Sequence, residues 1–430
     1  MPRNSFHKDR SGSSSRSRPG RRFGGGENRF SRPGQRSGGF SRGGNRSASS
    51  RRDKFANQTF SDVSKFINKA VITEEVEKFI PEHQFADFAL VEPLQRNLVE
   101  KGYIDPTPIQ DRSIPHVMRG EDVVGIANTG TGKTAAFLLP LINKLILDGR
   151  PRDRRVLIMV PTRELAVQIE QEYKAFAKGL GIYSVVCVGG ANINPQIREL
   201  ARKPHFVIGT PGRLKDLLER KALSLSDFKT AVLDEADRML DMGFINDMRA
   251  ILKLLPAPRH TLFFSATLSS DIEKLIGEFL TSPVRISVKT RDTSATIDQD
   301  VVRVPRGIDK FEVLHDLLIK PGFDKVLVFG RTKHGVEKLS KRLVQSGFKA
   351  ESIHGNKTQG KRQKALDLFK RDQVQILCAT DVAARGLDIS GVSHVINFDL
   401  PSTHEDYIHR IGRTGRAGKA GVALTFIEEK

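Results

Sequence analysis

A glycine-rich segment, residues 127–134, has the residue types that bind the phosphates of a nucleotide. Its glycines allow backbone N–H groups to close around phosphates at the start of a helix. The ammonium group of Lys133 would reach the β- and γ-phosphates, and the hydroxyl of Thr134 would coordinate Mg²⁺. The segment departs from the usual pattern at Ala127, where a glycine is expected. Further loop residues expected to contact phosphate are Thr129, Gly130, Thr131 and Gly132.

A second segment, Asp-Glu-Ala-Asp at residues 234–237, follows an apolar run and supplies the other half of such a site. A carboxylate at a strand end can hold Mg²⁺, and a neighbouring carboxylate can orient the attacking water. We assign the metal-side role to Asp234 and the role of general base to Glu235. An acidic helix N-cap, stabilised by the helix dipole, is the alternative. Because the acidic segment occurs together with a phosphate loop, the two indicate a nucleoside triphosphatase.

The elements that position these residues form a recurring pattern along the chain. Short apolar runs alternate with helical stretches and end at polar loops, which predicts βαβ units and parallel sheets. In such sheets ligands bind at the carboxyl ends of the strands. A polar stretch within residues 287–299 divides the runs into two series. The runs are residues 121–127, 155–160, 206–209, 230–233 and 261–264, then residues 325–329, 375–379 and 394–398.

The first 54 residues differ from the rest of the chain in composition. They contain 15 Lys and Arg against three Asp and Glu, and no Leu, Ile or Val, so they cannot bury a core and are predicted to be disordered. Arginine neutralises phosphates and stacks on bases, and phenylalanine offers a stacking platform. Phe23, Phe30 and Phe40 are spaced along this tail. The pattern favours contact with nucleic acid, and a solvated linker is the alternative.

The number of cysteines and the hydropathy of the chain indicate in which cellular compartment the protein is expected. The chain of 430 residues has two cysteines, Cys187 and Cys378, which excludes a disulfide scaffold and favours a reducing compartment. No run of 18 apolar residues occurs, so no transmembrane helix is predicted. The positively charged N-terminus has no apolar segment behind it, unlike a secretory signal. We therefore expect a cytoplasmic protein without membrane contact.

With further motifs in order, residues 85–426 resemble the DEAD-box ATP-dependent RNA helicases of superfamily 2. The Asp-Glu-Ala-Asp segment is the family's signature, and residues 102–110 resemble its Q motif, with Phe85 upstream. Asn128 stands where the family often has glutamine, a near-equivalent amide. The other matching segments are residues 161–166, 189–190, 210–213, 265–267, 329–332, Gln359 with Arg362, residues 380–388 and residues 409–416.

The resemblance implies an α/β fold of two tandem RecA-like parallel-sheet domains behind the disordered tail. Residues 55–84 match no motif and are expected to form a helical extension packed on the first domain. The expected divisions are the tail at residues 1–54, the extension at 55–84, the ATP-binding domain 1 at 85–288, a linker at 289–299 and the helicase C-terminal domain 2 at 300–430.

The resemblance also implies roles for individual residues, with ATP and Mg²⁺ as cofactors. Phe85 and Gln110 would contact adenine, because an amide can both donate to and accept from its edge. Asp388 would contact the ribose or aid domain closure. Arg413 and Arg416 would be arginine fingers on the γ-phosphate. Ser265 and Thr267 would couple the ATP state to closure. The expected RNA contacts are Thr162, Arg163, Gly190, Thr210 and Arg213 in domain 1, and Arg331, Gln359, Arg362 and Thr380 in domain 2.

Those hydroxyl, amide and guanidinium groups suit phosphate and sugar, so RNA binding with little sequence preference is expected. The enzyme would clamp RNA and separate short duplexes locally or remodel RNA–protein complexes. We expect a monomer whose partners include ribosomal, mRNA or degradation-complex proteins. Two alternatives stay open: an ATP-controlled RNA clamp or annealing chaperone with little net unwinding, and a DNA translocase on the same two-domain core.

Overall fold

The structure is a computed structural model that describes residues 66–68, 79–128, 130–150, 152–288, 297–384, 389, 391–415 and 421–429. By its contacts the chain divides into residues 1–53 and residues 54–430. The predicted tail, residues 1–54, lies outside the described ranges, as do three candidate site residues, Thr129, Asp388 and Arg416.

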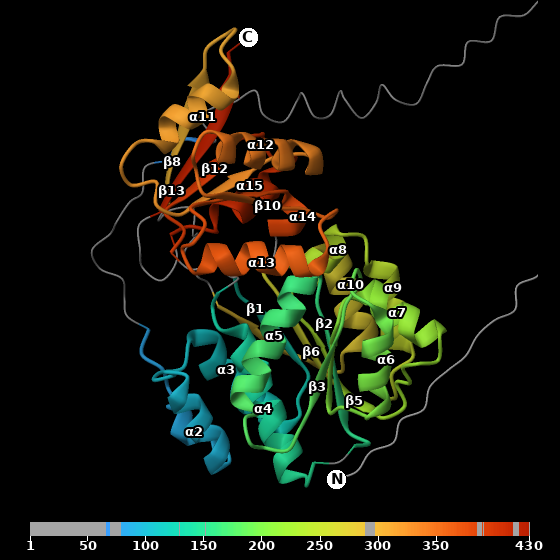
Figure 1. The fold of residues 1–430 in the computed structure, drawn as a ribbon. Helices are drawn as coiled ribbons and strands as arrows, with labels where there is room; N and C mark the ends of the chain where they lie inside the picture. The colour runs from blue at the N-terminus through green and yellow to red at the C-terminus, as the bar shows by residue number, and fades with distance from the viewer. Residues whose placement is uncertain are drawn as a thin grey trace, which may run out of the picture. The chain divides into compact units, whose positions relative to one another are not determined.

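The first sheet has seven strands in the order β3-β4-β2-β5-β6-β1-β7, and every neighbouring pair is parallel (Figure 1). Its central strands are continuous apolar runs, as expected for strands covered on both faces. The strands are β1 (Val123–Ile126), β2 (Arg155–Met159), β3 (Ser184–Cys187), β4 (Phe206–Gly209), β5 (Phe228–Leu233), β6 (His260–Ser265) and β7 (Val284–Ser287).

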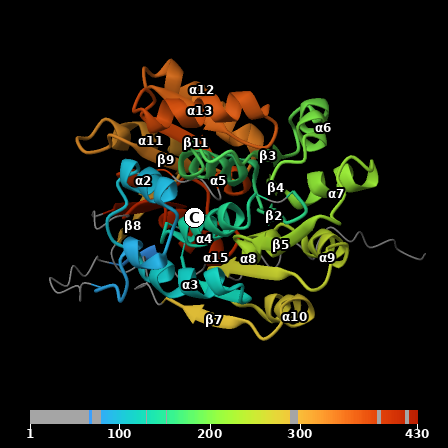
Figure 2. The same ribbon diagram turned by 90° about the horizontal axis from the view of Figure 1, so that it is seen from below.

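Successive strand residues enter different cores, as the two-residue period of a strand requires. Val123 lies in the core beneath α2–α5, whereas Val124 lies in the core beneath α6–α10. Figure 2 shows α3 and α4 on one side of this sheet and α7 and α9 on the other. The short helix η2 (Phe85–Phe88) joins the first core. The helices are α2 (Glu92–Glu100), α3 (Pro108–Arg119), α4 (Lys133–Leu147), α5 (Arg163–Phe176), α6 (Ile193–Ala201), α7 (Pro211–Glu219), α8 (Ala236–Asp241), α9 (Ile245–Lys253) and α10 (Ser270–Phe279).

The second sheet has six strands, also parallel throughout, in the order β10-β11-β9-β12-β13-β8. One core lies against α11 and α12, and another lies against α13 and α14. The strands are β8 (Ile297–Val304), β9 (Val326–Phe329), β10 (Ala350–Ile353), β11 (Ile376–Ala379), β12 (His394–Asn397) and β13 (Gly421–Glu428). The helices are α11 (Lys310–Leu318), α12 (Lys333–Gln345), α13 (Gln359–Lys370), α14 (Asp381–Ala384) and α15 (His404–Ile411).

The predicted fold class of two parallel-sheet α/β domains is confirmed, with two differences in detail. Strand β8 begins at Ile297, so residues 297–299 of the expected linker lie in the second sheet. The expectation of a helix packed on domain 1 differs from the structure at Phe66 and Asn68. Phe66 is buried against domain 2, and Asn68 forms an antiparallel bridge with Gln299 of β8. Apolar burial and an open strand edge determine this placement, and neither is visible in the local sequence.

Candidate functional site

The phosphate loop leads directly into α4, whose N-terminal cap is Gly132. The backbone of Gly132 has φ 93°, in the left-handed region that favours glycine. A Cβ at this position would also collide with the side-chain amide of Gln110. Gln110 donates from Nε2 to Gly132 O at 3.0 Å. The glycine is therefore needed both for the turn and for the close approach of the Gln110 side chain.

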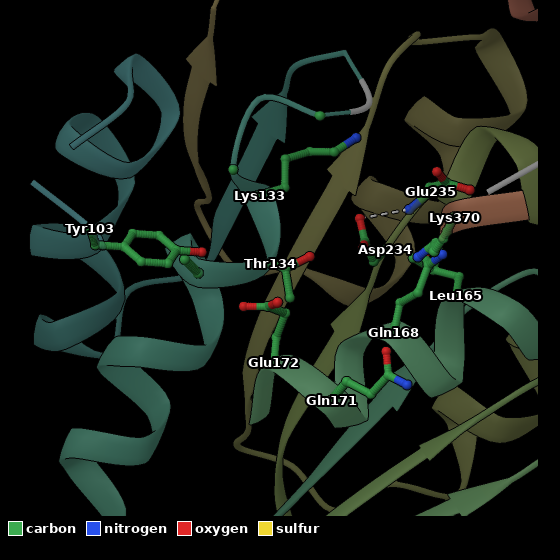
Figure 3. A pocket seen from close by; sticks show the side chains of 13 residues that line it. Tyr103, Lys133, Thr134, Leu165, Gln168, Gln171, Glu172, Asp234, Glu235 and Lys370 are labelled. Atoms are coloured by element: carbon green, nitrogen blue, oxygen red, sulfur yellow. Dashed lines mark hydrogen bonds between the residues drawn. The ribbon is translucent and has the colours of Figure 1, made fainter. Parts of the chain in front are cut away.

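Lys133, Thr134 and Asp234 line one cavity of about 280 Å³ at the carboxyl ends of β1 and β5 (Figure 3). The ammonium group of Lys133 donates to Ala127 O at 2.9 Å, across the loop. Asp234 is 2% exposed, and its Oδ1 accepts from the backbone N–H of Glu235 at 3.0 Å. Burial raises the pKa of Asp234 to about 6, although the Lys133 charge acts in the opposite direction. The phosphate loop and the acidic segment are thus brought together, as the sequence predicted.

Glu235 has the opposite electrostatic character from its neighbour. Burial alone would raise its pKa, but the charges of Arg238, Lys133 and Arg413 outweigh burial and hold the pKa below its usual value. Arg238 donates from Nη1 to Glu235 Oε2 at 2.5 Å. Glu235 also has φ 52° and ψ 51°, a backbone conformation that is costly for a residue with a Cβ. The side chain is thus an ionised carboxylate held in a fixed position, as a water-orienting base must be.

The two candidate coupling residues contact the acidic segment through Asp237. Oδ2 of Asp237 accepts three hydrogen bonds, from Ala266 N at 3.0 Å, Thr267 N at 2.9 Å and Thr267 Oγ1 at 3.1 Å. The backbone N–H of Asp237 donates to Ser265 Oγ at 3.3 Å, and Ser265 Oγ donates to Thr267 O at 2.8 Å. A displacement of the acidic segment would therefore move the loop after β6.

The two candidate adenine contacts lie in the first core. Phe85 is buried and packs edge-on against Phe88 and Tyr103. Gln110 is 1% exposed, and its Oε1 accepts from Thr107 N at 2.9 Å. With Nε2 bonded to Gly132, the amide retains one N–H and one lone pair for a further partner.

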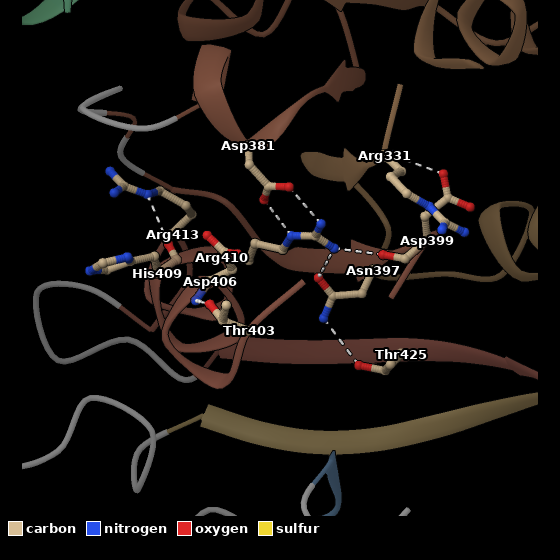
Figure 4. A network of polar contacts seen from close by, with 10 residues as sticks. All are labelled: Arg331, Asp381, Asn397, Asp399, Thr403, Asp406, His409, Arg410, Arg413 and Thr425. Carbon is tan, nitrogen blue, oxygen red and sulfur yellow. Dashed lines mark hydrogen bonds and ion pairs between the residues drawn. The ribbon is translucent and has the colours of Figure 1, made fainter. Parts of the chain in front are cut away.

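In domain 2, a buried arginine fixes α15 against the sheet (Figure 4). Arg410 binds both carboxylate oxygens of Asp381, at 2.6 and 2.8 Å. Its Nη1 donates to Asn397 Oδ1 at 3.2 Å and to Asp399 O at 2.6 Å. The guanidinium also lies over the ring of Phe329, 5.1 Å from its centroid. The helix that leads to the candidate arginine fingers is thereby anchored to three neighbouring elements.

Arg413 follows α15 directly and is held to the end of that helix. Its backbone N–H donates to Arg410 O at 3.1 Å, and its Nε donates to His409 O at 3.3 Å. Arg413 and His409 line a small cavity together with Lys133 and Glu235. The candidate finger thus shares a cavity with the candidate base.

The candidate RNA contacts of domain 1 lie at helix starts and in one loop. Thr162 caps α5, accepting from Leu165 N at 3.3 Å, and Thr210 is the cap residue of α7. The guanidinium of Arg163 covers Gly190, where φ is +71° and any Cβ would collide with it. Arg213 donates to Gln196 Oε1 at 2.8 Å and to Ala191 O at 3.1 Å. These contacts shape the loop at residues 189–192.

The candidate RNA contacts of domain 2 are dispersed over three strand ends. The backbone N–H of Arg331 donates to Asp399 Oδ2 at 2.8 Å. Thr380 accepts at its backbone oxygen from Ala383 N and Ala384 N, at 2.9 Å each, where α14 starts. Arg362 is buried, and its Nε lies 2.8 Å from Glu164 Oε1. Both polar atoms of the Gln359 amide are buried without a protein partner.

Sequence reasoning gave no separate role to Asp237, Arg238, Arg410 or Glu164, although all lie within the quoted motifs or beside them. The sequence does contain a signal for these four residues: each is a charged residue beside apolar residues in the chain. Because a charged residue is rarely buried unless it is paired, such a position indicates a buried ion pair or hydrogen-bond network. Among the described residues, every helix is too short or too polar to cross a membrane.

Known families and proteins match this chain over most of its length. Residues 107–275 match the DEAD/DEAH box helicase family and residues 309–418 match the helicase conserved C-terminal domain. The ATP-dependent RNA helicase CshA of Limosilactobacillus reuteri is 46% identical over 345 residues, which make up 80% of this chain and 69% of that protein. CshA of Listeria monocytogenes is 46% identical over 348 residues, 81% of this chain and 66% of the relative. The chain thus spans about two thirds of the length of these relatives.

Two solved structures share the fold. S. cerevisiae Dbp5 bound to RNA and ADP BeF3 has a TM-score of 0.71 and 30% identity, covering 80% of this chain and 90% of that chain. Mss116p, with its NTE and C-tail deleted and bound to ssRNA and AMP-PNP, has a TM-score of 0.73 and 31% identity, covering 82% and 77%. Given the identity to CshA and the match to both helicase domains, the chain belongs to the family of DEAD-box ATP-dependent RNA helicases.

Proposed function

We propose that the protein is an RNA-dependent ATPase that clamps RNA and locally separates short duplexes or remodels RNA–protein complexes. The observation that carries the proposal is the cavity at the carboxyl ends of β1 and β5, where a loop lysine meets two carboxylates of opposite pKa shift. The solved structures of Dbp5 and Mss116p, each bound to RNA and a nucleotide, support it.

The residues at this cavity fit a nucleotide and Mg²⁺. The loop at Gly130–Gly132 precedes a helix N-terminus, which favours phosphate. Thr134 and Asp234 line the same cavity and offer the oxygen atoms that Mg²⁺ prefers. When bound, Mg²⁺ would neutralise charge on the phosphate oxygens. Lys133 would give up its bond to Ala127 O and turn toward the phosphates.

Glu235 would act as the base that orients the attacking water. Its lowered pKa keeps it ionised at neutral pH, and its bond to Arg238 fixes the direction of the carboxylate. Arg413, which shares a cavity with Glu235, would stabilise the charge that develops on the transferred phosphate. We also assign Arg416 to this task, and Asp388 to the ribose or to domain closure.

Coupling to RNA would run through the hydrogen bonds of Asp237. Movement of the acidic segment with the ATP state would displace Ser265 and Thr267, and closure of the two domains would follow. RNA would lie on the loops at Thr162, Arg163, Gly190, Thr210 and Arg213 in domain 1, and at Arg331, Gln359, Arg362 and Thr380 in domain 2. The buried amide of Gln359 has unmet hydrogen-bonding capacity, which favours its role as a contact.

The test of this function compares three activities of the purified full chain. ATP turnover is measured with and without saturating single-stranded RNA, and strand separation is measured on matched short RNA and DNA duplexes. We expect turnover to rise with RNA. RNA bound to both domains would hold them together, so that less entropy is lost when Arg413 approaches the phosphate. Separation of RNA duplexes alone supports the helicase. Equal action on DNA supports a translocase, and RNA-stimulated turnover without separation supports a clamp or annealing chaperone.

A second experiment tests the order of closure and hydrolysis. Glu235→Gln removes the charge of the base with little change of shape, so the variant should bind ATP and RNA but stall before hydrolysis. Its complex with RNA and ATP should dissociate more slowly than that of the wild-type protein in a gel-shift chase. An unchanged lifetime would mean that Glu235 is not the base or that closure does not precede hydrolysis.

We place the protein in the cytoplasm as a monomer, with ribosomal, mRNA or degradation-complex proteins as partners. The two cysteines fit this compartment, since both are free, buried thiols and neither is part of a disulfide. Such thiols are inert toward oxidation.

A further inference from the structure

The segment Phe66–Asn68 comes before domain 1 in the chain but packs on domain 2. Phe66 is 0% exposed and belongs to a small buried cluster with Ile297 of β8, Tyr407 and Ile411 of α15, and Ala423 of β13. Its ring meets the ring of Tyr407 edge-on, with centroids 5.0 Å apart. Two backbone hydrogen bonds hold the segment: Asn68 N donates to Gln299 O at 3.0 Å, and Gln299 N donates to Asn68 O at 2.8 Å.

This cluster packs against one face of α15, and Arg410 projects from a different face of the same helix. Tyr407 and Ile411 are four residues apart, so they lie on one face of the helix. Tyr407 also donates from its hydroxyl to Gln299 Oε1 at 2.9 Å, which joins α15 to the strand that Asn68 bridges. Arg410 faces Asp381 and Asn397 instead. The helix is therefore held by a polar network on one face and an apolar cluster on another.

Arg413 depends on α15 for its position. Its backbone and its side chain both donate to carbonyl oxygens of the last helical turn, those of Arg410 and His409. A rotation or shift of the helix would be transmitted to the guanidinium, because these two hydrogen bonds tie Arg413 to the last helical turn. Displacements of about 1 Å at a reacting centre can cost on the order of 10²-fold in rate.

We propose that Phe66 is a positioning residue for Arg413, acting through Tyr407 and α15. The proposal rests on the role of Arg413 as an arginine finger given under the proposed function. The docked segment holds the finger helix at the orientation in which Arg413 meets the transferred phosphate. A residue that precedes domain 1 in the chain thereby positions a catalytic arginine of domain 2.

The neighbouring residue provides a matched control. Ile67 is 47% exposed and lies outside the cluster, although it is an apolar residue of the same segment. Ile67→Ala removes a similar side chain without changing the support of α15. A third variant, Asn68→Pro, removes the backbone N–H that Gln299 O accepts and so undocks the segment while Phe66 is retained.

The experiment measures RNA-saturated ATP turnover of the full chain in a double-mutant cycle. Phe66→Ala, Phe66→Leu, Asn68→Pro and Ile67→Ala are each made with Arg413 present and with Arg413→Ala. With Arg413 present, we expect Phe66→Ala and Asn68→Pro to lower kcat about tenfold, Phe66→Leu to restore part of the rate, and Ile67→Ala to leave it unchanged. KM for ATP and affinity for RNA should change less than twofold.

In the Arg413→Ala background the same substitutions should change kcat less than twofold, because the group that they position is absent. A tenfold loss in both backgrounds would overturn the proposal, since Phe66 would then act on general structure. No loss in either background would overturn it as well. If Arg413→Ala alone leaves turnover unchanged, Arg413 is not an arginine finger. That result contradicts the proposed function and can be recognised without any variant of Phe66. Circular dichroism of each variant checks folding, and Phe66→Leu and Asn68→Pro carry the test if Phe66→Ala does not fold.

Discussion

Buried charged residues lie at the strand ends of both sheets, but their surroundings differ. At the first sheet, Asp234 and Glu235 are adjacent, yet the pKa of one is raised and that of the other is lowered. At the second sheet, Arg410 directs three nitrogens at Asp381, Asn397 and Asp399. The first arrangement sets two neighbouring carboxyl groups with opposite pKa shifts beside Lys133, whereas the second is a hydrogen-bond network among side chains and backbone of domain 2. The comparison teaches that buried charge at strand ends can have two consequences: at the first sheet it shifts the pKa values of neighbouring carboxyl groups in opposite directions, and at the second sheet it anchors a helix.

The largest expected effect is at the phosphate loop. Lys133→Ala should lower RNA-stimulated ATP turnover by at least about 10³-fold, because the loop loses its mobile charge on the phosphates. The fold should be retained, since the hydrogen bond that the Lys133 side chain donates to Ala127 O lies within the loop and can be replaced when the loop rearranges. Turnover and thermal unfolding of the variant are measured together. Wild-type turnover in a folded variant would contradict the assignment of the loop.

Two arginines three residues apart test the comparison directly. Arg413→Ala should lower turnover about 10²- to 10³-fold with little change in stability, because a transition-state contact is lost. Arg410→Ala leaves Asp381 without its partner and should lower the free energy of unfolding by about 3–5 kcal/mol. Denaturant unfolding and turnover of both variants separate the two roles. If both variants lose stability equally, the distinction between them is wrong.

The raised pKa of Asp234 predicts the next effect. The Mg²⁺ concentration that gives half-maximal turnover should rise as the pH drops below about 6, because a proton then competes with Mg²⁺ for this carboxylate. The sign for stability is opposite: the native carboxyl keeps its proton up to about pH 6, whereas the carboxyl of the unfolded chain releases it near its usual pKa of 3.8. Stability due to this group therefore decreases as the pH rises between these values and is lost above pH 6. Asp234→Asn should gain up to about 3 kcal/mol at pH 7.5 while losing activity.

A variant with no such gain in chemical denaturation at pH 7.5 would show that Asp234 titrates near its usual value. Glu235→Gln is the matched control, because the charges around Glu235 stabilise its ionised form and the substitution should not increase stability.

The smallest effect on turnover is expected from the tail. Deletion of residues 1–54 should leave RNA-saturated turnover nearly unchanged but weaken RNA binding, most at low salt. If about five of its basic residues contact phosphate, the slope of log affinity against log salt should be steeper by about 3.5 in the full chain, at about 0.7 per contact. Binding curves at several salt concentrations measure the slopes. Equal slopes with and without the tail would mean that the tail does not contact RNA phosphates and is a solvated linker.

The fold class and the centre of the site could be predicted because their signals are local. Asp234 follows the apolar run of β5 directly, and the glycine-rich loop that leads to Lys133 follows the apolar run of β1. The ends of parallel strands meet at one edge of a sheet, so these two signals indicate one site. Short outer strands such as β3, β7 and β10 were not predicted, because polar residues interrupt or flank their apolar residues, whereas the predicted central strands are continuous apolar runs.

The structural role of Arg410 was also missed. Its partners Asp381 and Asn397 are 29 and 13 residues away, and no local pattern shows that the three meet. The placement of Phe66 shows the same limit: one phenylalanine in a segment without a motif gives no indication of which domain will bury it.

The bridge between Asn68 and Gln299 also has a consequence for solubility. Strand β8 is the outermost strand of its sheet, and an outer strand offers backbone donors and acceptors to strands of other molecules. Asn68 occupies a position along that edge, and Phe66 covers Tyr407 beside it. A fragment that starts at Ile297 would lack both residues. It should therefore self-associate at a lower concentration than the full chain. The segment Phe66–Asn68 would then reduce aggregation of the second domain by covering part of the edge of its sheet.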